Sequence, residues 1–156
     1  MAEEKKEYLT KKKYDELVEE LKYLKNTKRK EIAEALDYAR GLGDLSENAE
    51  YHEARSEQAD VEERIAKIDR ILKNATVVED RHGEYAMIGS TIIVEKKSDS
   101  TQRTFMIVGS AESDMSAGKI SNQSPLGAAV LGKKKGDSFS FQTPSGKMEY
   151  KVIDIK

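Results

Sequence analysis

The sequence predicts an α+β protein, in which an N-terminal antiparallel α-helical coiled-coil hairpin precedes a small antiparallel β domain. Helical periodicity continues to about Asn74, and Gly41 and Gly43 are the only glycines before that point. Gly, Ser and Thr then become common, and segments such as "SFSFQT" alternate apolar and polar residues as half-buried strands do. We therefore divide the chain into residues 1–76 and 77–156.

Composition supports this division. Charged residues make up 36% of the 156 residues, which favours long solvated helices over one compact core. The net charge of -2 gives no global reason to expect binding to nucleic acid or membrane. The chain has no cysteine, no apolar run long enough to span a bilayer and no apolar signal segment in "MAEEKKEY". These features predict a cytoplasmic protein without a disulfide framework.

The first helix is predicted to start after Leu9. Thr10 suits an N-cap, and Leu9 can pack on Tyr14 as a hydrophobic staple. Apolar seam positions then recur with steps of three and four. They are Tyr14, Leu17, Leu21, Leu24, Ile32, Ala35 and Ala39, with Lys28 as a polar member.

A second seam follows the glycines and pairs with the first as an antiparallel hairpin. Its members are Tyr51, Ala54, Gln58, Val61, Ile65, Ile68 and Leu72. Matching Tyr14 with Leu72 places the apex between Leu42 and Gly43, where the turn signal lies. Lys28 then faces Gln58 in a polar layer that fixes register. Arms of about 30 residues at 1.5 Å each project about 45 Å.

The second half contains alternating segments typical of a twisted antiparallel sheet. The predicted strands are Ala75–Val78, Thr91–Glu95, Thr104–Val108, Asp137–Thr143 and Met148–Ile155. Ser124 and Pro125 suit the N-cap and first residue of a short helix that ends before Gly132.

The predicted apex carries an acidic segment. From Gly41 to Ala54 the chain has Asp44, Glu47, Glu50 and Glu53 but no Lys or Arg. One interpretation is a capping box with Asp44 as N-cap and Glu47 at the third helical position, favoured by the helix dipole. The other is a Mg²⁺ site, although two carboxylates need ligands from a partner to hold the ion.

Two motifs add a family resemblance that covers essentially the whole chain. "GDLSENAEYHEAR" at a hairpin tip and "SPLGAAVLGKKKGD" in the second half resemble the bacterial GreA/GreB family of transcript-cleavage (transcription elongation) factors. The resemblance implies an FKBP-like second domain that docks on RNA polymerase, while the hairpin enters the secondary channel. Asp44 and Glu47 would then help the polymerase active site hold a second Mg²⁺ that hydrolyses backtracked RNA.

The resemblance also implies that the chain is not itself an enzyme. Its partners would be RNA polymerase and the nascent RNA 3′ end, with no membrane, no tightly bound cofactor and Mg²⁺ shared with the polymerase; the chain would act as a monomer. Arg55 would lie near the RNA, and the segment around Ser121, Ser124 and Pro125 would dock on the polymerase.

A basic belt on the first helical arm leaves two interpretations open. Lys22, Lys25 and Arg29 share a face, which is either solvated or in contact with RNA phosphates or a channel wall. The two histidines, His52 and His82, have no triad or metal-ligand spacing and indicate surface or packing roles.

Two other functions compete with transcript cleavage. An FKBP-like domain suggests a peptidyl-prolyl isomerase, but the few aromatic residues in the second half and the absence of Trp give an aromatic proline pocket little support. A related factor could instead occupy the channel and inhibit. The intact pair Asp44 and Glu47 argues against a tip that has lost cleavage.

Overall fold

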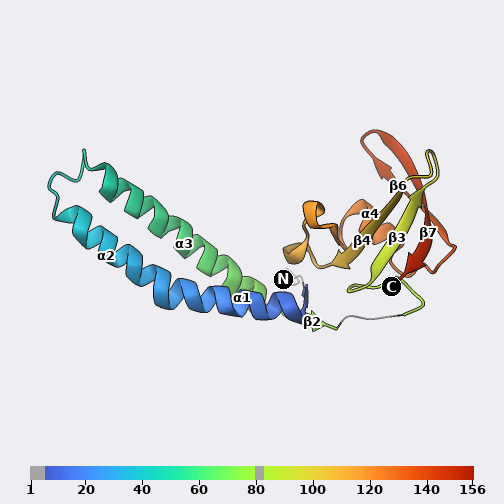
Figure 1. Cartoon of the computed structure of the whole chain (residues 1–156), viewed down its shortest axis with the longest axis horizontal. Helices are drawn as coiled ribbons and strands as arrows, with labels where there is room; N and C mark the ends of the chain where they lie inside the picture. Colours follow the sequence, from blue (N-terminus) through green and yellow to red (C-terminus); the bar gives the residue numbers. More distant parts are fainter. Residues whose placement is uncertain (1–5, 80–82) are drawn as a thin grey trace, which may run out of the picture. The chain divides into compact units, whose positions relative to one another are not determined.

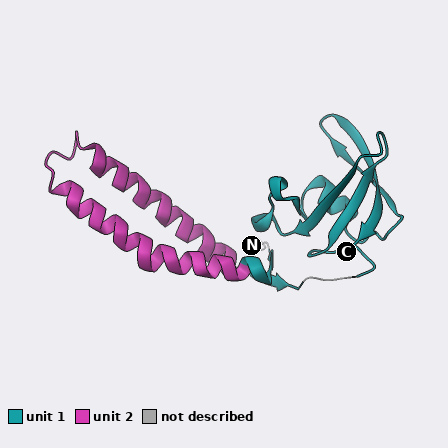
Figure 2. Ribbon diagram, in the orientation of Figure 1, with its two compact units in different colours: residues 1–13, 75–156 teal, residues 14–74 magenta. Residues whose placement is uncertain are grey.

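The computed structural model describes residues 6–79 and 83–156, which form two compact units (Figure 2). One is the helical hairpin Tyr14–Asn74, and the other contains the chain up to Lys13 and from Ala75 onward. The α+β class is confirmed. The predicted division at residue 76 placed the N-terminus with the hairpin, whereas strand β1 (Glu7–Thr10) pairs in parallel with β2 (Ala75–Val78) and so joins the second unit.

The hairpin has two helical arms (Figure 1). The first arm runs through α1 (Lys11–Tyr23), the π-helix η1 (Leu24–Lys28) and α2 (Arg29–Arg40), and the second arm is α3 (Ala49–Lys73). The apolar residues buried along the two arms are Leu17, Leu24, Ile32, Leu36, Ala39, Ala54, Val61, Ile65 and Ile68. None of the helices among the described residues is long and apolar enough to cross a bilayer.

The observed seam differs from the predicted one near the end of the first arm. Leu36 is buried at 5% exposure, and Ala35 is exposed, so the predicted seam position at Ala35 is wrong. Both positions keep the three- and four-residue spacing between Ile32 and Ala39, so the spacing alone does not distinguish Ala35 from Leu36. The observed seam advances in steps of four from Leu24 to Leu36.

The polar layer at Lys28 also differs from the prediction. Lys28 pairs with Glu57, and Gln58 instead accepts a 3.0 Å hydrogen bond from Arg55 on its own helix. Farther toward the base, Arg64 forms a two-pronged ion pair with Glu20 at 2.7 and 2.8 Å. Because these pairs join opposite arms, they oppose sliding of one helix along the other. Exposed ion pairs add little to net stability, so the apolar seam contributes most of the stability.

At the base of the first arm, Thr10 caps α1 as predicted. Its Oγ1 accepts a 3.2 Å hydrogen bond from the Lys13 N–H. The Thr10 N–H and hydroxyl donate in turn to the two carboxylate oxygens of Glu112, at 3.1 and 2.8 Å. In a capping box the third helical residue supplies that carboxylate, but here the position is Lys13, and the acid comes from 102 residues away. Packing of Leu9 on Tyr14 stays a prediction, although Leu9 is fully buried.

The second unit contains a five-stranded sheet in the order β5-β4-β3-β7-β6. Its strands are β3 (Thr91–Lys96), β4 (Gln102–Val108), β5 (Lys119–Ser121), β6 (Ser138–Thr143) and β7 (Gly146–Ile155). All five predicted strands are present, but only four of them belong to this sheet, where they pair antiparallel as predicted. The fifth, β2, pairs in parallel with β1 in a separate two-stranded sheet, so its predicted place in the antiparallel sheet is wrong. The short edge strand β5, which was not predicted, pairs in parallel with β4. Buried Ile92, Ile107 and Val152 lie at the centre of the core.

Helix α4 (Pro125–Val130) begins as the sequence predicts. The Ser124 Oγ accepts a 3.1 Å hydrogen bond from the Gly127 N–H and donates to the Ser121 carbonyl at 2.6 Å. A Cβ on Gly127 would lie 2.0 Å from that carbonyl oxygen, so only glycine permits this close approach. Val130 then packs into the core of the sheet.

Candidate functional site

The loop that joins α2 to α3 forms the tip of the hairpin (Figure 1). Every residue from Gly41 to Glu47 is exposed. Helix α2 ends with the Gly41 N–H bonded to the Asp37 and Tyr38 carbonyls. Gly43 follows with φ +118°, a left-handed conformation that favours glycine, and it turns the chain. The chain therefore turns at the predicted glycines, although the connection between the arms extends farther, to Asn48.

Asn48, rather than Asp44, caps α3. Its side-chain oxygen accepts a 3.1 Å hydrogen bond from the Tyr51 N–H, and α3 begins at Ala49. The Asn48 amide also donates to the Ala39 carbonyl at 2.6 Å and thereby ties α3 to the end of α2. The predicted capping box of Asp44 and Glu47 is wrong because the loop is four residues longer than that interpretation assumed. Neither carboxylate is needed to start the helix.

Asp44 has a defined local setting. Its Oδ1 accepts two hydrogen bonds from Ser46, one from the backbone N–H at 3.0 Å and one from the hydroxyl at 2.8 Å. These bonds, first from the backbone N–H and then from the hydroxyl, lower the pKa of Asp44 because they stabilise its charged form. Asp44 is consequently an anion at neutral pH, with Oδ1 occupied and Oδ2 facing no donor among the described residues.

Glu47 is the second carboxylate of the tip. It is exposed and forms no hydrogen bond or ion pair with any part of the chain that the structure describes. The nearest bases in sequence are engaged elsewhere, since Arg40 pairs with Asp37 at 3.6 Å and Arg55 bonds to Gln58. The loop therefore presents negative charge that no neighbouring cation neutralises.

These carboxylates fit a hard cation in chemistry but not in number. Carboxylate oxygens are the ligands that Mg²⁺ prefers, and the tip offers Asp44 Oδ2 and both oxygens of Glu47. Within residues 6–79 and 83–156, no group of three His, Asp or Glu side chains is arranged to hold a metal ion. The tip can contribute ligands to a site that another molecule completes.

The predicted basic contacts divide into two kinds. Lys25 pairs with Asp69 at 3.5 Å, and Arg29 forms a two-pronged ion pair with Glu62 at 2.7 and 2.8 Å. Both bases therefore form ion pairs between the two arms of the hairpin. Lys22 is exposed and has no ion pair among the described residues, and Arg55 is exposed apart from its bond to Gln58. Contact of any of these bases with RNA stays a prediction.

A histidine and two leucines also lie at the tip. His52 is exposed and lies 3.4 Å from the Ser46 carbonyl, with its ring edge-on to Tyr51, which fits the predicted local packing role. His82 lies outside the described residues. Sequence reasoning missed the apolar side chains at the tip, since Leu42 and Leu45 are exposed at 54% and 41%.

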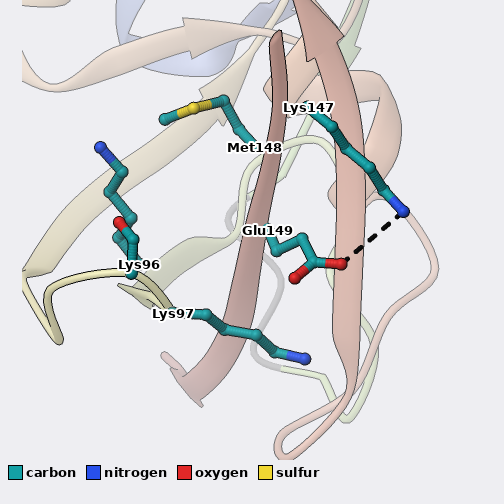
Figure 3. A pocket seen from close by; sticks show the side chains of 6 residues that line it. Lys96, Lys97, Lys147, Met148 and Glu149 are labelled. Carbon is teal, nitrogen blue, oxygen red and sulfur yellow. Dashed lines mark ion pairs between the residues drawn. The ribbon is translucent and has the colours of Figure 1, made fainter.

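In the second unit, a surface pocket lies where β3 ends and β7 begins (Figure 3). Lys147 points toward Glu149 and pairs with it at 3.6 Å, while the ammonium groups of Lys96 and Lys97 point away from each other. Because these charges do not converge, the pocket lacks the geometry of an anion site. The predicted docking residues Ser121, Ser124 and Pro125 lie elsewhere in this unit, around the start of α4.

Both halves of the chain match known family models. Residues 7–77 match "Transcription elongation factor, N-terminal", and residues 82–156 match "Transcription elongation factor, GreA/GreB, C-term". The chain belongs to the GreA/GreB family of transcription elongation factors.

Curated members of the GreA/GreB family align with the chain over its whole length. It is 47% identical to transcription elongation factor GreA of Clostridium acetobutylicum and 42% identical to that of Geobacillus kaustophilus, with 100% of both chains covered in each case. A solved structure of GreA factor homolog 1 (Gfh1) of Thermus thermophilus is 30% identical, covers 97% of this chain and 99% of that chain, and has a TM-score of 0.42.

Proposed function

We propose that this chain binds RNA polymerase and stimulates Mg²⁺-dependent cleavage of backtracked nascent RNA. The observation that supports the proposal is the pair of exposed, unneutralised carboxylates Asp44 and Glu47 at the hairpin tip. Asn48 performs the capping task, so the structure of α3 gives no reason for these acids. Membership of the GreA/GreB family supplies the polymerase as the partner.

The tip contributes oriented negative charge rather than a complete active site. In two-metal phosphodiester hydrolysis a second Mg²⁺ helps to activate water or to stabilise the leaving oxygen. Asp44 and Glu47 would provide oxygen ligands from this chain, and the polymerase would provide the remainder. The chemistry belongs to the polymerase, and this chain acts as its activator.

The hairpin shape suits delivery of the tip. Its two arms pack along one apolar seam, and cross-arm ion pairs such as Arg29 with Glu62 oppose sliding of one arm along the other. A narrow rod can enter the secondary channel of the polymerase where a globular domain cannot. We assign docking to the second unit, at the surface formed by Ser121, Ser124 and Pro125. Lys22 and Arg55 are the bases that remain available for the RNA 3′ end.

A prolyl isomerase activity has weaker support. Phe139 and Tyr150 are 6% and 8% exposed, and their rings stack with the half-buried Phe141. Buried rings cannot line an open proline pocket. Inhibition by occupying the channel is the second candidate function. An inhibitor would slow elongation without shortening the RNA, whereas a cleavage factor shortens it.

The deciding experiment adds the protein to stalled, backtracked elongation complexes that carry labelled RNA. We expect shortened transcripts that regain the ability to elongate when nucleotides are added. Slower elongation without shortened RNA would overturn the proposal and favour an inhibitor.

A further inference from the structure

In the short loop segment 44–46, two hydrogen bonds engage one oxygen of the Asp44 carboxylate. Both donors of Ser46, its N–H and its hydroxyl, converge on the same oxygen of Asp44, at 3.0 and 2.8 Å. Oδ2 is left pointing away from these donors. An exposed aspartate without such bonds would sample several staggered rotamers and spread its oxygens over a wide volume.

We propose that Ser46 is a positioning residue for the tip, which fixes Asp44 so that Oδ2 is presented to the cation shared with the polymerase. This inference rests on the proposed function, since it names how one of the two assisting carboxylates is preorganised. Partners that orient a metal ligand change metal affinity by about 10- to 100-fold when they are removed. The gain arises because less rotamer entropy is lost when the cation binds.

The surroundings of Ser46 support this role. Its carbonyl lies 3.4 Å from the His52 ring on the first turns of α3, and Asn48 fixes the start of that helix two residues farther on. Ser46 is therefore attached to a rigid element on its C-terminal side while it bonds to Asp44 on the other. No comparable bond holds Glu47 among the described residues, so Asp44 is the acid of the pair that the loop itself positions.

The test compares Ser46→Ala, Ser46→Thr and a control, Ser56→Ala, at an exposed serine of α3. The first readout is independent of activity. Three-bond NMR couplings report the side-chain rotamers of Asp44 in the free protein. We expect one dominant rotamer in the parent, the Thr variant and the control, and averaged couplings in Ser46→Ala, which keeps only the backbone donor.

The second readout is the Mg²⁺ dependence of stimulated cleavage. We expect Ser46→Ala to raise the half-saturating Mg²⁺ concentration by about tenfold, at the lower end of the range for such partners because the loop is exposed. The maximal rate and polymerase affinity should change little, and Ser46→Thr should restore the parent value. A merely structural role would alter binding or melting temperature instead.

Two results would overturn the inference. One is a dominant Asp44 rotamer in Ser46→Ala, and the other is a half-saturating Mg²⁺ concentration within about twofold of the control. Failure of the proposed function itself looks different, because the parent protein would then stimulate no cleavage at all while the rotamer difference persisted.

Discussion

Asn48 is the residue whose replacement should most clearly separate the structure of the tip from its chemistry. Asn48→Ala removes the N-cap bond to the Tyr51 N–H, which costs about 1 kcal/mol in helices generally. It also removes the 2.6 Å bond to the Ala39 carbonyl, worth about another 1 kcal/mol. The Ala39 carbonyl keeps its bond from the Leu42 N–H, so it is not left without a donor. We therefore expect a total loss of about 2 kcal/mol.

Thermal and urea unfolding followed by circular dichroism at the helical band measure this loss. For a cooperative unit of the hairpin's size, about 2 kcal/mol lowers the melting temperature by about 8 to 16 °C. Asn48→Asp keeps an acceptor for the cap but loses the donor to Ala39, so it should lose about half as much. Asp44→Ala should change the melting temperature less than either variant. The reasoning fails if Asp44→Ala destabilises the hairpin as much as Asn48→Ala, since Asp44 would then be the cap.

Three further predictions test other parts of the structure. Leu36→Ala should cost about 2 to 5 kcal/mol of unfolding free energy, whereas Ala35→Ser, on the exposed side, should cost under about 1 kcal/mol; equal losses in urea unfolding would contradict the shifted seam. Glu112→Ala leaves the buried N–H of Thr10 unpaired and should lower the free energy of unfolding by about 1 to 3 kcal/mol. A loss below about 0.5 kcal/mol would show that this hydrogen bond does not stabilise the protein. Pro125→Glu keeps a residue suited to a helix start, so it should weaken polymerase binding with little change in melting temperature, and unaltered affinity would place docking elsewhere.

Local sequence signals predicted much of this fold because the physics behind them is local. The steps of three and four, the glycines at the apex and the Ser124–Pro125 helix start each depend on neighbours within a few residues. The alternating strands were found for the same reason. Only Gly43 carries the positive φ at the apex, yet the pair of glycines was sufficient to locate the turn.

The wrong predictions concern positions where two local patterns fit equally well, or where a residue far away in the sequence supplies the contact. The N-terminus of the second helix had two candidate caps in the sequence. Asp44, with Glu47 three residues on, fits a capping box, and Asn48 also fits an N-cap. Only the path of the loop shows that Asn48 is the cap. Ala35 and Leu36 both satisfy the three- and four-residue spacing between Ile32 and Ala39, and only the packing of the two arms shows that Leu36 is the buried one. Glu112 meets Thr10 across 102 residues, a pairing that no spacing rule contains.

The candidate site was predicted in composition but not in detail. The acidic stretch and the family resemblance identified Asp44 and Glu47, while the structure adds the Ser46 bonds and removes the capping role. It also assigns Lys25 and Arg29 to ion pairs within the hairpin, a result that depends on which residues of α3 lie opposite.

The most direct test of the central claim removes the charge of the tip while keeping its shape. Asp44→Asn retains an oxygen that can accept from Ser46, and Glu47→Gln changes only an exposed side chain. Glu63→Gln, at an exposed acid of α3 away from the tip, is the matched control. Neutral amides are much poorer partners for Mg²⁺ than carboxylates. With backtracked complexes and labelled RNA, the account predicts that both tip variants lose stimulated cleavage. They should keep polymerase binding and melt within about 3 °C of the parent, while the control cleaves normally. If both tip variants cleave like the parent, the acidic tip does not assist cleavage and the proposed function is wrong.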